Sequence, residues 1–157
     1  MWKNISSLLG YFENTFSILL LLSATLVLFI NIVLRYLFNS GLSWAEEYIS
    51  YAMIWATFLG ASICVRQKAH VAMTLILDGV KSETKRKIYQ AVLRLVSILF
   101  CVWVLYLGIK QVIFLKGMDQ TSPAMRLPMY FPYLAIPIGF GLMVIRLIEE
   151  FIGQYKF

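Results

Sequence analysis

The sequence predicts an all-α integral membrane protein, with four transmembrane helices in a single membrane domain of residues 1–157. Two observations lead to this fold class. Hydrophobic residues make up 61% of the chain and charged residues only 14%, whereas a soluble domain has about 25% charged residues. Four apolar runs are also long enough to cross a hydrocarbon core of about 30 Å as helices. They cover residues 16–37, 44–65, 88–109 and 129–148.

The distribution of lysine and arginine predicts the orientation of these spans. The loop at 36–43 contains neither residue, whereas the connection between spans two and three is strongly basic, with Arg66, Lys68, Lys81, Lys85, Arg86 and Lys87. Basic connections stay in the cytoplasm. Both termini should therefore be cytoplasmic, and the loops 36–43 and 110–128 should face outward. The net charge of +6 then reports topology, and we expect no nucleic-acid partner.

Two shorter segments suit the membrane surface rather than a span. The N-terminal segment before residue 16 mixes apolar residues with Lys3 and Glu13, which favours an interfacial helix over a cleavable signal peptide. The apolar segment 71–77 is too short to cross, so we expect a second, cytoplasmic interfacial helix between spans two and three. The single histidine, His70, precedes it and has no obvious metal-ligating partners in the sequence.

The turn between spans one and two carries the charges closest to the membrane. Ser43 and Glu46 have the spacing of a capping box, which predicts a helix that begins near Trp44. Glu46 and Glu47 are thus interpreted as helix caps, with an ion or proton site as the alternative. Because span two returns antiparallel to span one, Arg35 should pair with Glu46 or Glu47 across the hairpin.

Span two has a face of small residues at four-residue spacing, Ala52, Ala56 and Gly60, which allows close helix packing. Tyr51 and Trp55 lie on the neighbouring stripe. We interpret these five residues as a helix-packing face, with a docking face for another subunit as the alternative.

The polar and helix-breaking residues of the last two spans give further expectations. Arg94 lies about 9 Å into span three at about 1.5 Å per residue, where it could snorkel, bind a membrane lipid phosphate, or meet Glu149 or Glu150. Pro128 can open the fourth helix, whereas Pro137 should kink that helix near mid-membrane.

The sequence contains none of the patterns that indicate catalysis. It has no phosphate-binding glycine loop, no Cys/His metal spacing and no nucleophile motif, so we expect no enzyme, no cofactor and no catalytic, substrate-binding or metal residues. It also lacks the inverted repeat of a complete secondary carrier. We expect a chain that works with other subunits. A self-sufficient homo-oligomeric channel or exporter is the alternative, and a membrane enzyme is a third hypothesis.

Several short motifs, taken in order, resemble the small permease subunit of TRAP (tripartite ATP-independent periplasmic) transporters. The resemblance covers nearly the whole chain and rests on their shared order and spacing. The residues that carry it are Arg35-Tyr36, Phe38-Asn39, Trp44, Glu46-Glu47, Trp55, 58–61, Arg66, His70-Val71, 122–124, Leu127-Pro128 and 135–139.

This resemblance implies a bacterial inner-membrane complex with a large TRAP membrane subunit and a periplasmic substrate-binding protein. It implies sodium-driven import of an organic acid such as sialic acid or a C4-dicarboxylate. The small subunit resembles a scaffold, so no substrate-binding residue is transferred to this chain. Lys116, Asp119 and Arg126 could contact the binding protein, or be solvated loop residues.

Overall fold

The computed structural model describes residues 2–66 and 83–154, and these residues form helices joined by short loops. The helices are α1 (Trp2–Phe38), α2 (Ala45–Arg66), α4 (Glu83–Gly117), α5 (Tyr130–Tyr133) and α6 (Ala135–Gln154). Within these described residues, four segments are long and apolar enough to cross a membrane, namely Gly10–Phe38, Ala45–Val65, Ile88–Gly117 and Tyr130–Glu149. The predicted all-α fold with four spans is therefore confirmed. His70 and the interfacial segment predicted at 71–77 lie outside the described residues.

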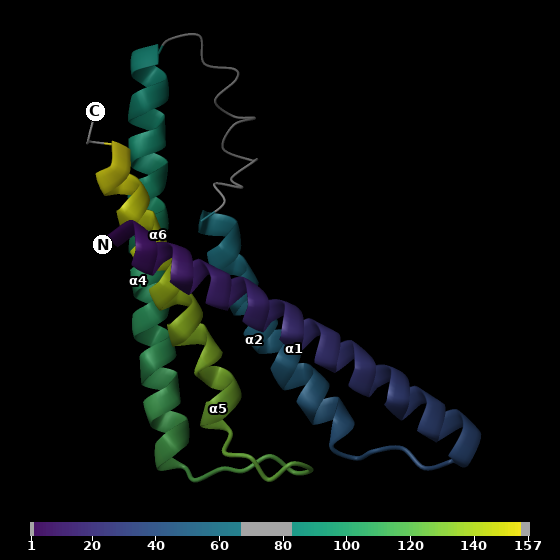
Figure 1. Cartoon of the computed structure of the whole chain (residues 1–157). Helices are drawn as coiled ribbons and strands as arrows, with labels where there is room; N and C mark the ends of the chain where they lie inside the picture. The colour runs from purple at the N-terminus through teal and green to yellow at the C-terminus, as the bar shows by residue number, and fades with distance from the viewer. Residues whose placement is uncertain (1, 67–82, 155–157) are drawn as a thin grey trace.

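The helices pack in an order that differs from their order in the sequence. α1 and α2 form an antiparallel hairpin, and α6 packs against both α2 and α4 (Figure 1). The loops 39–44 and 118–129 lie at the same end of the molecule, which we call the loop end. The first turns of α1 and the last turns of α6 lie toward the opposite end.

Two helices are longer than the sequence predicted. No separate N-terminal helix precedes the first span, because α1 runs unbroken from Trp2 to Phe38. No proline interrupts that segment, and extending an existing helix is easier than starting another. α4 likewise continues past Ile109 to Gly117. Lys110 remains in that helix, with its ammonium 5.7 Å from the centre of the Tyr106 ring, which is a favourable cation–π geometry.

The fourth span is interrupted earlier than expected. The short helix α5 ends at Tyr133 and α6 begins at Ala135, so the break falls at Leu134. Pro137 stands in the first turn of α6, where a missing backbone N–H is tolerated. The backbone at Leu134 itself keeps helical φ and ψ angles of −60° and −24°, so the two helices follow one another within a single span, Tyr130–Glu149. The kink expected at Pro137 stays a prediction.

Close approach of the helices depends on two glycines that lie outside the predicted packing face of α2. A Cβ atom at Gly139 would lie 2.7 Å from the Phe58 Cβ on α2, and one at Gly108 would lie 3.0 Å from the Ile136 Cγ2. Gly60, predicted to be a point of close contact, has nothing within 4 Å of a Cβ atom. A glycine contributes to close helix packing only where the backbone or side chains of another helix come near it.

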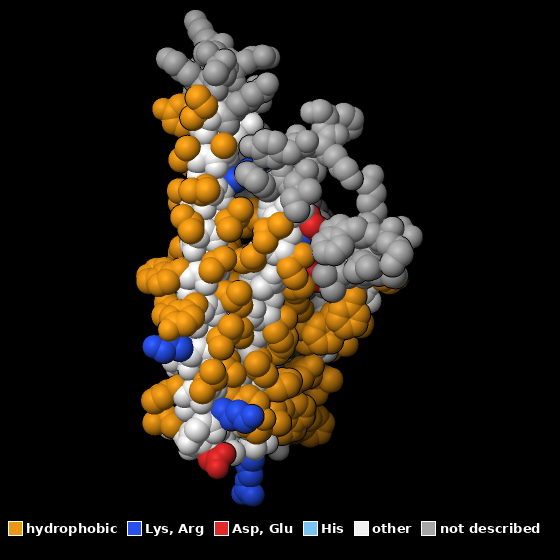
Figure 2. Space-filling model, turned by 90° about the vertical axis from the view of Figure 1, so that its left-hand side faces the viewer, with side chains coloured by type: hydrophobic (Ala, Val, Ile, Leu, Met, Phe, Trp, Pro, Cys, Tyr) orange, Lys and Arg blue, Asp and Glu red, His pale blue; other side chains and the backbone are white. Residues whose placement is uncertain are grey.

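The outside of the bundle is apolar. One side of α4 exposes a stripe of large hydrophobic residues at helical spacing, namely Leu95, Leu99, Trp103, Tyr106 and Ile113. Figure 2 shows hydrophobic side chains over most of the face that it presents, with lysine and arginine side chains mainly near one end. Such a surface suits lipid or another membrane subunit.

Substituting Gly139 tests the contact between α2 and α6. The change Gly139→Ala should lower the free energy of unfolding by about 1–3 kcal/mol, because the new methyl group overpacks against Phe58. Gly60→Ala is the matched control and should be neutral or stabilising, since alanine is the better helix former. Thermal unfolding in detergent micelles measures both. Equal midpoints for the two variants would contradict this account of the packing.

Candidate functional site

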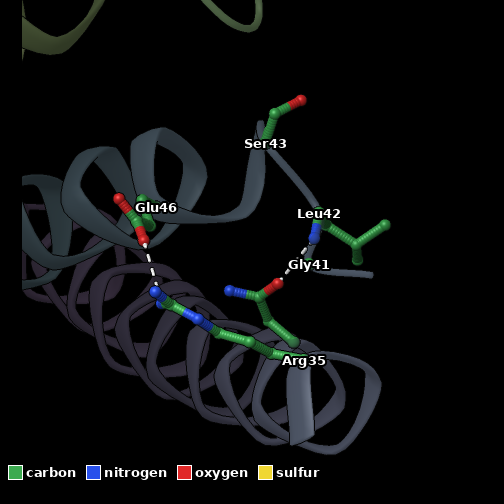
Figure 3. Close-up of a pocket in the computed structure, with 6 residues that line it drawn as sticks. Arg35, Gly41, Leu42, Ser43 and Glu46 are labelled. Carbon is green, nitrogen blue, oxygen red and sulfur yellow. Dashed lines mark hydrogen bonds and ion pairs between the residues drawn. The ribbon is translucent and has the colours of Figure 1, made fainter. Parts of the chain in front are cut away.

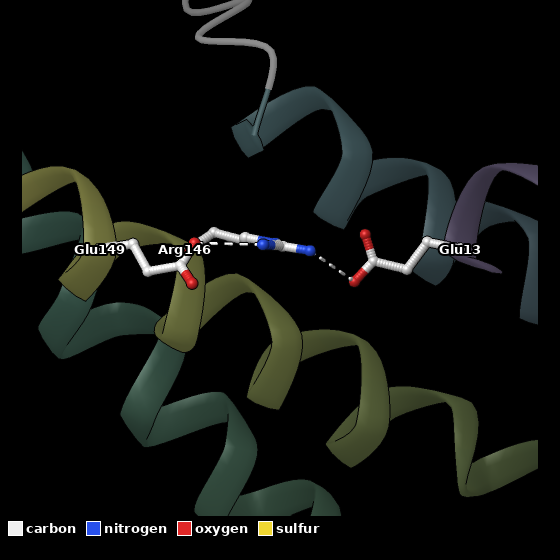
Figure 4. Close-up of polar contacts among 3 residues, drawn as sticks. All are labelled: Glu13, Arg146 and Glu149. Atoms are coloured by element: carbon white, nitrogen blue, oxygen red, sulfur yellow. Dashed lines mark hydrogen bonds and ion pairs between the residues drawn. The ribbon is translucent and has the colours of Figure 1, made fainter. Parts of the chain in front are cut away.

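Two charged side chains of the described residues, Glu13 and Arg146, are almost fully buried, and with the partly buried Glu149 they form a group that we call the charge cluster. The Arg146 Nη2 lies 3.6 Å from the Glu13 Oε1, and the Nη1 donates a hydrogen bond to the Glu149 Oε2 at 3.1 Å. Figure 4 shows the Arg146 guanidinium between the two carboxylates. The side chains of Arg146 and Glu13 are only 2% and 1% exposed.

The charge cluster joins the first span to the last. An unpaired charge within the membrane costs several kcal/mol (about 2.5–3.5 on insertion scales), so each member needs its partner. Glu149 is one turn from Arg146 on α6 and helps to orient the guanidinium, while Glu13 reaches it from α1. Arginine suits this position because its fork can bind two carboxylates at once.

Sequence reasoning missed this cluster. It considered Glu149 only in relation to Arg94, which stays a prediction, and the structure shows a contact of Glu149 with Arg146. The available signal was Arg146 itself, an ionisable residue inside an apolar run, which by default requires a partner. Nothing in the sequence pattern identifies that partner, because Glu13 lies near the other end of the chain.

At the loop end, Glu47 holds the 118–129 loop. Its Oε1 accepts a hydrogen bond from the Ala124 N–H at 2.9 Å, and its Oε2 accepts one from the Met125 N–H at 2.8 Å. The loop is further closed by Ser122, which is 2% exposed and whose hydroxyl accepts from the Leu127 N–H. The Glu47 carboxylate therefore connects the start of α2 to a loop distant in sequence.

The neighbouring acid, Glu46, faces α1 rather than the 118–129 loop. Its Oε1 lies 4.0 Å from the Arg35 Nη1 across the α1–α2 hairpin, and both side chains are exposed. The predicted capping box does not form, since among the described hydrogen bonds Ser43 and Glu46 exchange none, and Figure 3 shows the Ser43 hydroxyl directed away from Glu46. Adjacent residues point about 100° apart on a helix, so the two acids reach different partners.

Two polar residues of α1, the buried Asn31 and the partly buried Ser23, also fix the hairpin. The Asn31 Oδ1 accepts a hydrogen bond from the Leu42 N–H at 2.7 Å, and the Tyr48 hydroxyl donates to the Ser23 Oγ at 2.8 Å. Asn39, with φ 49°, ends α1 in the left-handed conformation that asparagine tolerates.

The predicted packing face of α2 makes contacts within the chain. The Tyr51 hydroxyl donates to the Met129 Sδ at 3.9 Å, and the Trp55 and Phe131 rings lie 5.8 Å apart. Ala52 and Ala56 are buried, while Gly60 is not closely packed. The aromatic pair thus contributes to packing against the segment around α5.

The three charged residues considered for a partner contact are all exposed at the loop end. Lys116 is in the last turn of α4, and Asp119 and Arg126 belong to the 118–129 loop. Asp119 and Arg126 have positive φ angles of 49° and 53°. Among the described residues, no group of three His, Cys, Asp or Glu side chains could hold a metal ion.

The fold and these contacts define a small four-span membrane protein whose buried charges bind one another or its own backbone. Residues 24–157 match the model of the DctQ component of the tripartite ATP-independent periplasmic transporters. The chain belongs to this family of TRAP small permease subunits, so it is a transporter component and not an enzyme.

Individual relatives agree with that assignment. The chain is 32% identical over 144 residues to a putative TRAP transporter small permease protein of Haemophilus influenzae, covering 90% of this chain and 84% of the relative. The C4-dicarboxylate TRAP transporter small permease protein DctQ of Vibrio cholerae is 26% identical over 148 residues, with 80% and 63% covered. The isethionate TRAP transporter permease protein DctMQ of Oleidesulfovibrio alaskensis is 27% identical over 113 residues, which are 72% of this chain but 18% of that protein.

Removing Arg146 tests the charge cluster. Arg146→Met should lower the free energy of unfolding by about 3–5 kcal/mol, because it leaves Glu13 buried without its cation. Arg35→Met is the matched control at an exposed pair and should cost about 0.2–1 kcal/mol. Adding Glu13→Gln to Arg146→Met should recover part of the loss. Denaturant titration in mixed micelles measures all three variants, and similar losses for both arginines would contradict the role of burial.

Replacing Glu47 tests the connection to the 118–129 loop. Glu47→Ala should expose the amides of Ala124 and Met125, because their acceptor is removed. Hydrogen exchange of peptides from this loop should then be faster than in the unchanged protein. The neighbouring change Glu46→Ala removes an equal charge from the same helix turn and should leave these peptides unaffected. Equal acceleration by both changes would reduce Glu47 to a general helix cap.

Proposed function

We propose that this chain is the scaffold subunit of a TRAP transporter: it is required for uptake, binds no transported solute, and holds a larger membrane subunit in place. The observation that carries the proposal is the use of its charged side chains. Arg146 binds Glu13 and Glu149, and Glu47 binds backbone amides. A solute or ion path needs polar groups that face a cavity, whereas these groups hold helices and loops together.

The proposed partners are a large TRAP membrane subunit and a periplasmic substrate-binding protein. The match to the DctMQ permease protein supports a large membrane partner. In DctMQ, the region similar to this chain is only 18% of a much longer polypeptide. The exposed apolar stripe of α4 is a suitable surface for it. The proposed contact for the binding protein is the 118–129 loop, which Glu47 holds in place. This surface carries Asp119 and Arg126, with Lys116 adjacent to it.

We propose a bacterial inner-membrane location, with both termini cytoplasmic and the loop end periplasmic. The support is the basic connection between α2 and α4, which the positive-inside rule assigns to the cytoplasm. The grouping of both described loops at the loop end is consistent with this orientation. The Arg35–Glu46 pair would then set the crossing of α1 and α2 at the periplasmic boundary.

The proposed cargo is an organic acid, such as a C4-dicarboxylate or sialic acid, imported with a sodium gradient. Two relatives, from Vibrio cholerae and Rhodobacter capsulatus, are named for C4-dicarboxylate. Others are named for isethionate and for ectoine. Such different solutes among similar small subunits support the view that this subunit does not select the cargo.

Reconstitution tests the scaffold function. Liposomes containing this chain alone should take up no labelled succinate or sialic acid above empty liposomes, because the chain provides no solute path. Adding the large subunit and the binding protein should permit uptake of the cognate acid under an inward sodium gradient. Equal sodium on both sides is the control. Sodium-dependent uptake by the chain alone would overturn the proposal in favour of a self-sufficient carrier.

A further inference from the structure

An open pocket lies at the loop end, between the end of α1 and the start of α2. Its volume is about 220 Å³, and it is lined by Asn31, Arg35, Gly41, Leu42, Ser43 and Glu46. Figure 3 shows the pocket, with the Arg35 and Glu46 side chains extended toward each other along one side. The residues that line it thus offer one cation, one anion and neutral polar groups in a small space.

The polar groups of the pocket retain capacity for a ligand. Asn31 is 7% exposed, and its Oδ1 is occupied by the Leu42 N–H. Among the described residues no hydrogen bond from its Nδ2 is seen, so the two N–H groups of this amide remain available to a ligand in the open pocket. Arg35 and Glu46 are only loosely paired at 4.0 Å, with side chains 69% and 79% exposed. Both charges therefore remain accessible.

This arrangement complements a zwitterion. The Arg35 guanidinium and the Asn31 Nδ2 are donors suited to a phosphate. Glu46 is an acceptor suited to an ammonium group. A headgroup with a phosphate and an ammonium would engage both members of the ion pair, whereas an anionic headgroup would meet the Glu46 carboxylate with unfavourable charge.

The surroundings place the pocket at the depth of lipid headgroups. The apolar spans end at Phe38 and begin again at Ala45, on either side of it. Aromatic side chains are exposed at the same level, with Tyr36 and Trp44 in the neighbourhood, as is typical of the membrane interface. Leu28 lies one to two turns further into the membrane, on the same side of α1 as Asn31 and Arg35, and is exposed to receive an acyl chain.

We propose that this pocket binds the headgroup of a zwitterionic phospholipid of the phosphatidylethanolamine type. The phosphate contacts Arg35 and Asn31, the ammonium contacts Glu46, and an acyl chain follows α1. The bound lipid would fill the space between the two helices of the hairpin at the loop end. The assignment does not depend on the proposed transport function.

Native mass spectrometry of the full chain, released from micelles that contain one defined lipid, tests this assignment. Phosphatidylethanolamine should bind more tightly than phosphatidylglycerol. Arg35→Gln should weaken phosphatidylethanolamine binding about tenfold, as expected for one charge-assisted hydrogen bond. Glu46→Gln should weaken the binding of phosphatidylethanolamine, whereas the binding of phosphatidylglycerol should stay the same or become tighter. Arg126→Gln and Asp119→Asn are matched controls in the 118–129 loop and should change neither affinity.

Three outcomes would overturn the proposal. Equal binding of both lipids to every variant would make the contact nonspecific. A preference for phosphatidylglycerol would indicate an anionic-lipid site that uses Arg35 alone. Competition by soluble phosphoethanolamine at the same concentration as the lipid would indicate a site for a free phosphate compound. If Arg35→Gln fails to fold, Arg35→Lys keeps the charge but loses the fork, and should still reduce affinity for phosphatidylethanolamine.

Discussion

The burial of Arg146 is the constraint on which the arrangement of the helices most depends. A guanidinium that is almost fully excluded from solvent within an apolar span must be matched by carboxylates. Glu149 comes from the same helix, but Glu13 comes from α1, whose main packing partner is α2. Glu13 is therefore held against α6 by charge, while the main packing of α1 is with α2 in the hairpin.

At the loop end, backbone N–H groups rather than charges require partners. Irregular backbone next to a membrane needs acceptors for its N–H groups, and Glu47 supplies two of them, for Ala124 and Met125. Glu46, one residue away, faces α1 and Arg35. The two adjacent acids thus point in different directions because of the helical twist. Glu46 contacts the end of α1, and Glu47 contacts the 118–129 loop, so both segments are joined to the start of α2.

Polar groups directed inward and apolar groups directed outward suit a scaffold. The charge cluster and the Glu47 contacts oppose relative movement of helices, and Phe58 against Gly139 leaves no space for sliding between α2 and α6. The outward stripe on α4 consists of large exposed hydrophobic residues. This arrangement supports the proposed scaffold role, in which the chain holds a partner in place without itself providing a route for a charged solute.

The sequence by itself determined the class of fold, the four spans and the family, because length, hydropathy and motif order are properties of the chain alone. It also predicted that Arg35 meets Glu46 or Glu47, since a short hairpin leaves few alternatives, and the structure shows that Glu46 is the partner. Only the tertiary structure decided that Glu47 binds the 118–129 loop, that Arg146 binds Glu13, and that Gly139 rather than Gly60 meets another helix. These contacts join segments distant in sequence, and their geometry depends on how the helices cross, which no local pattern encodes.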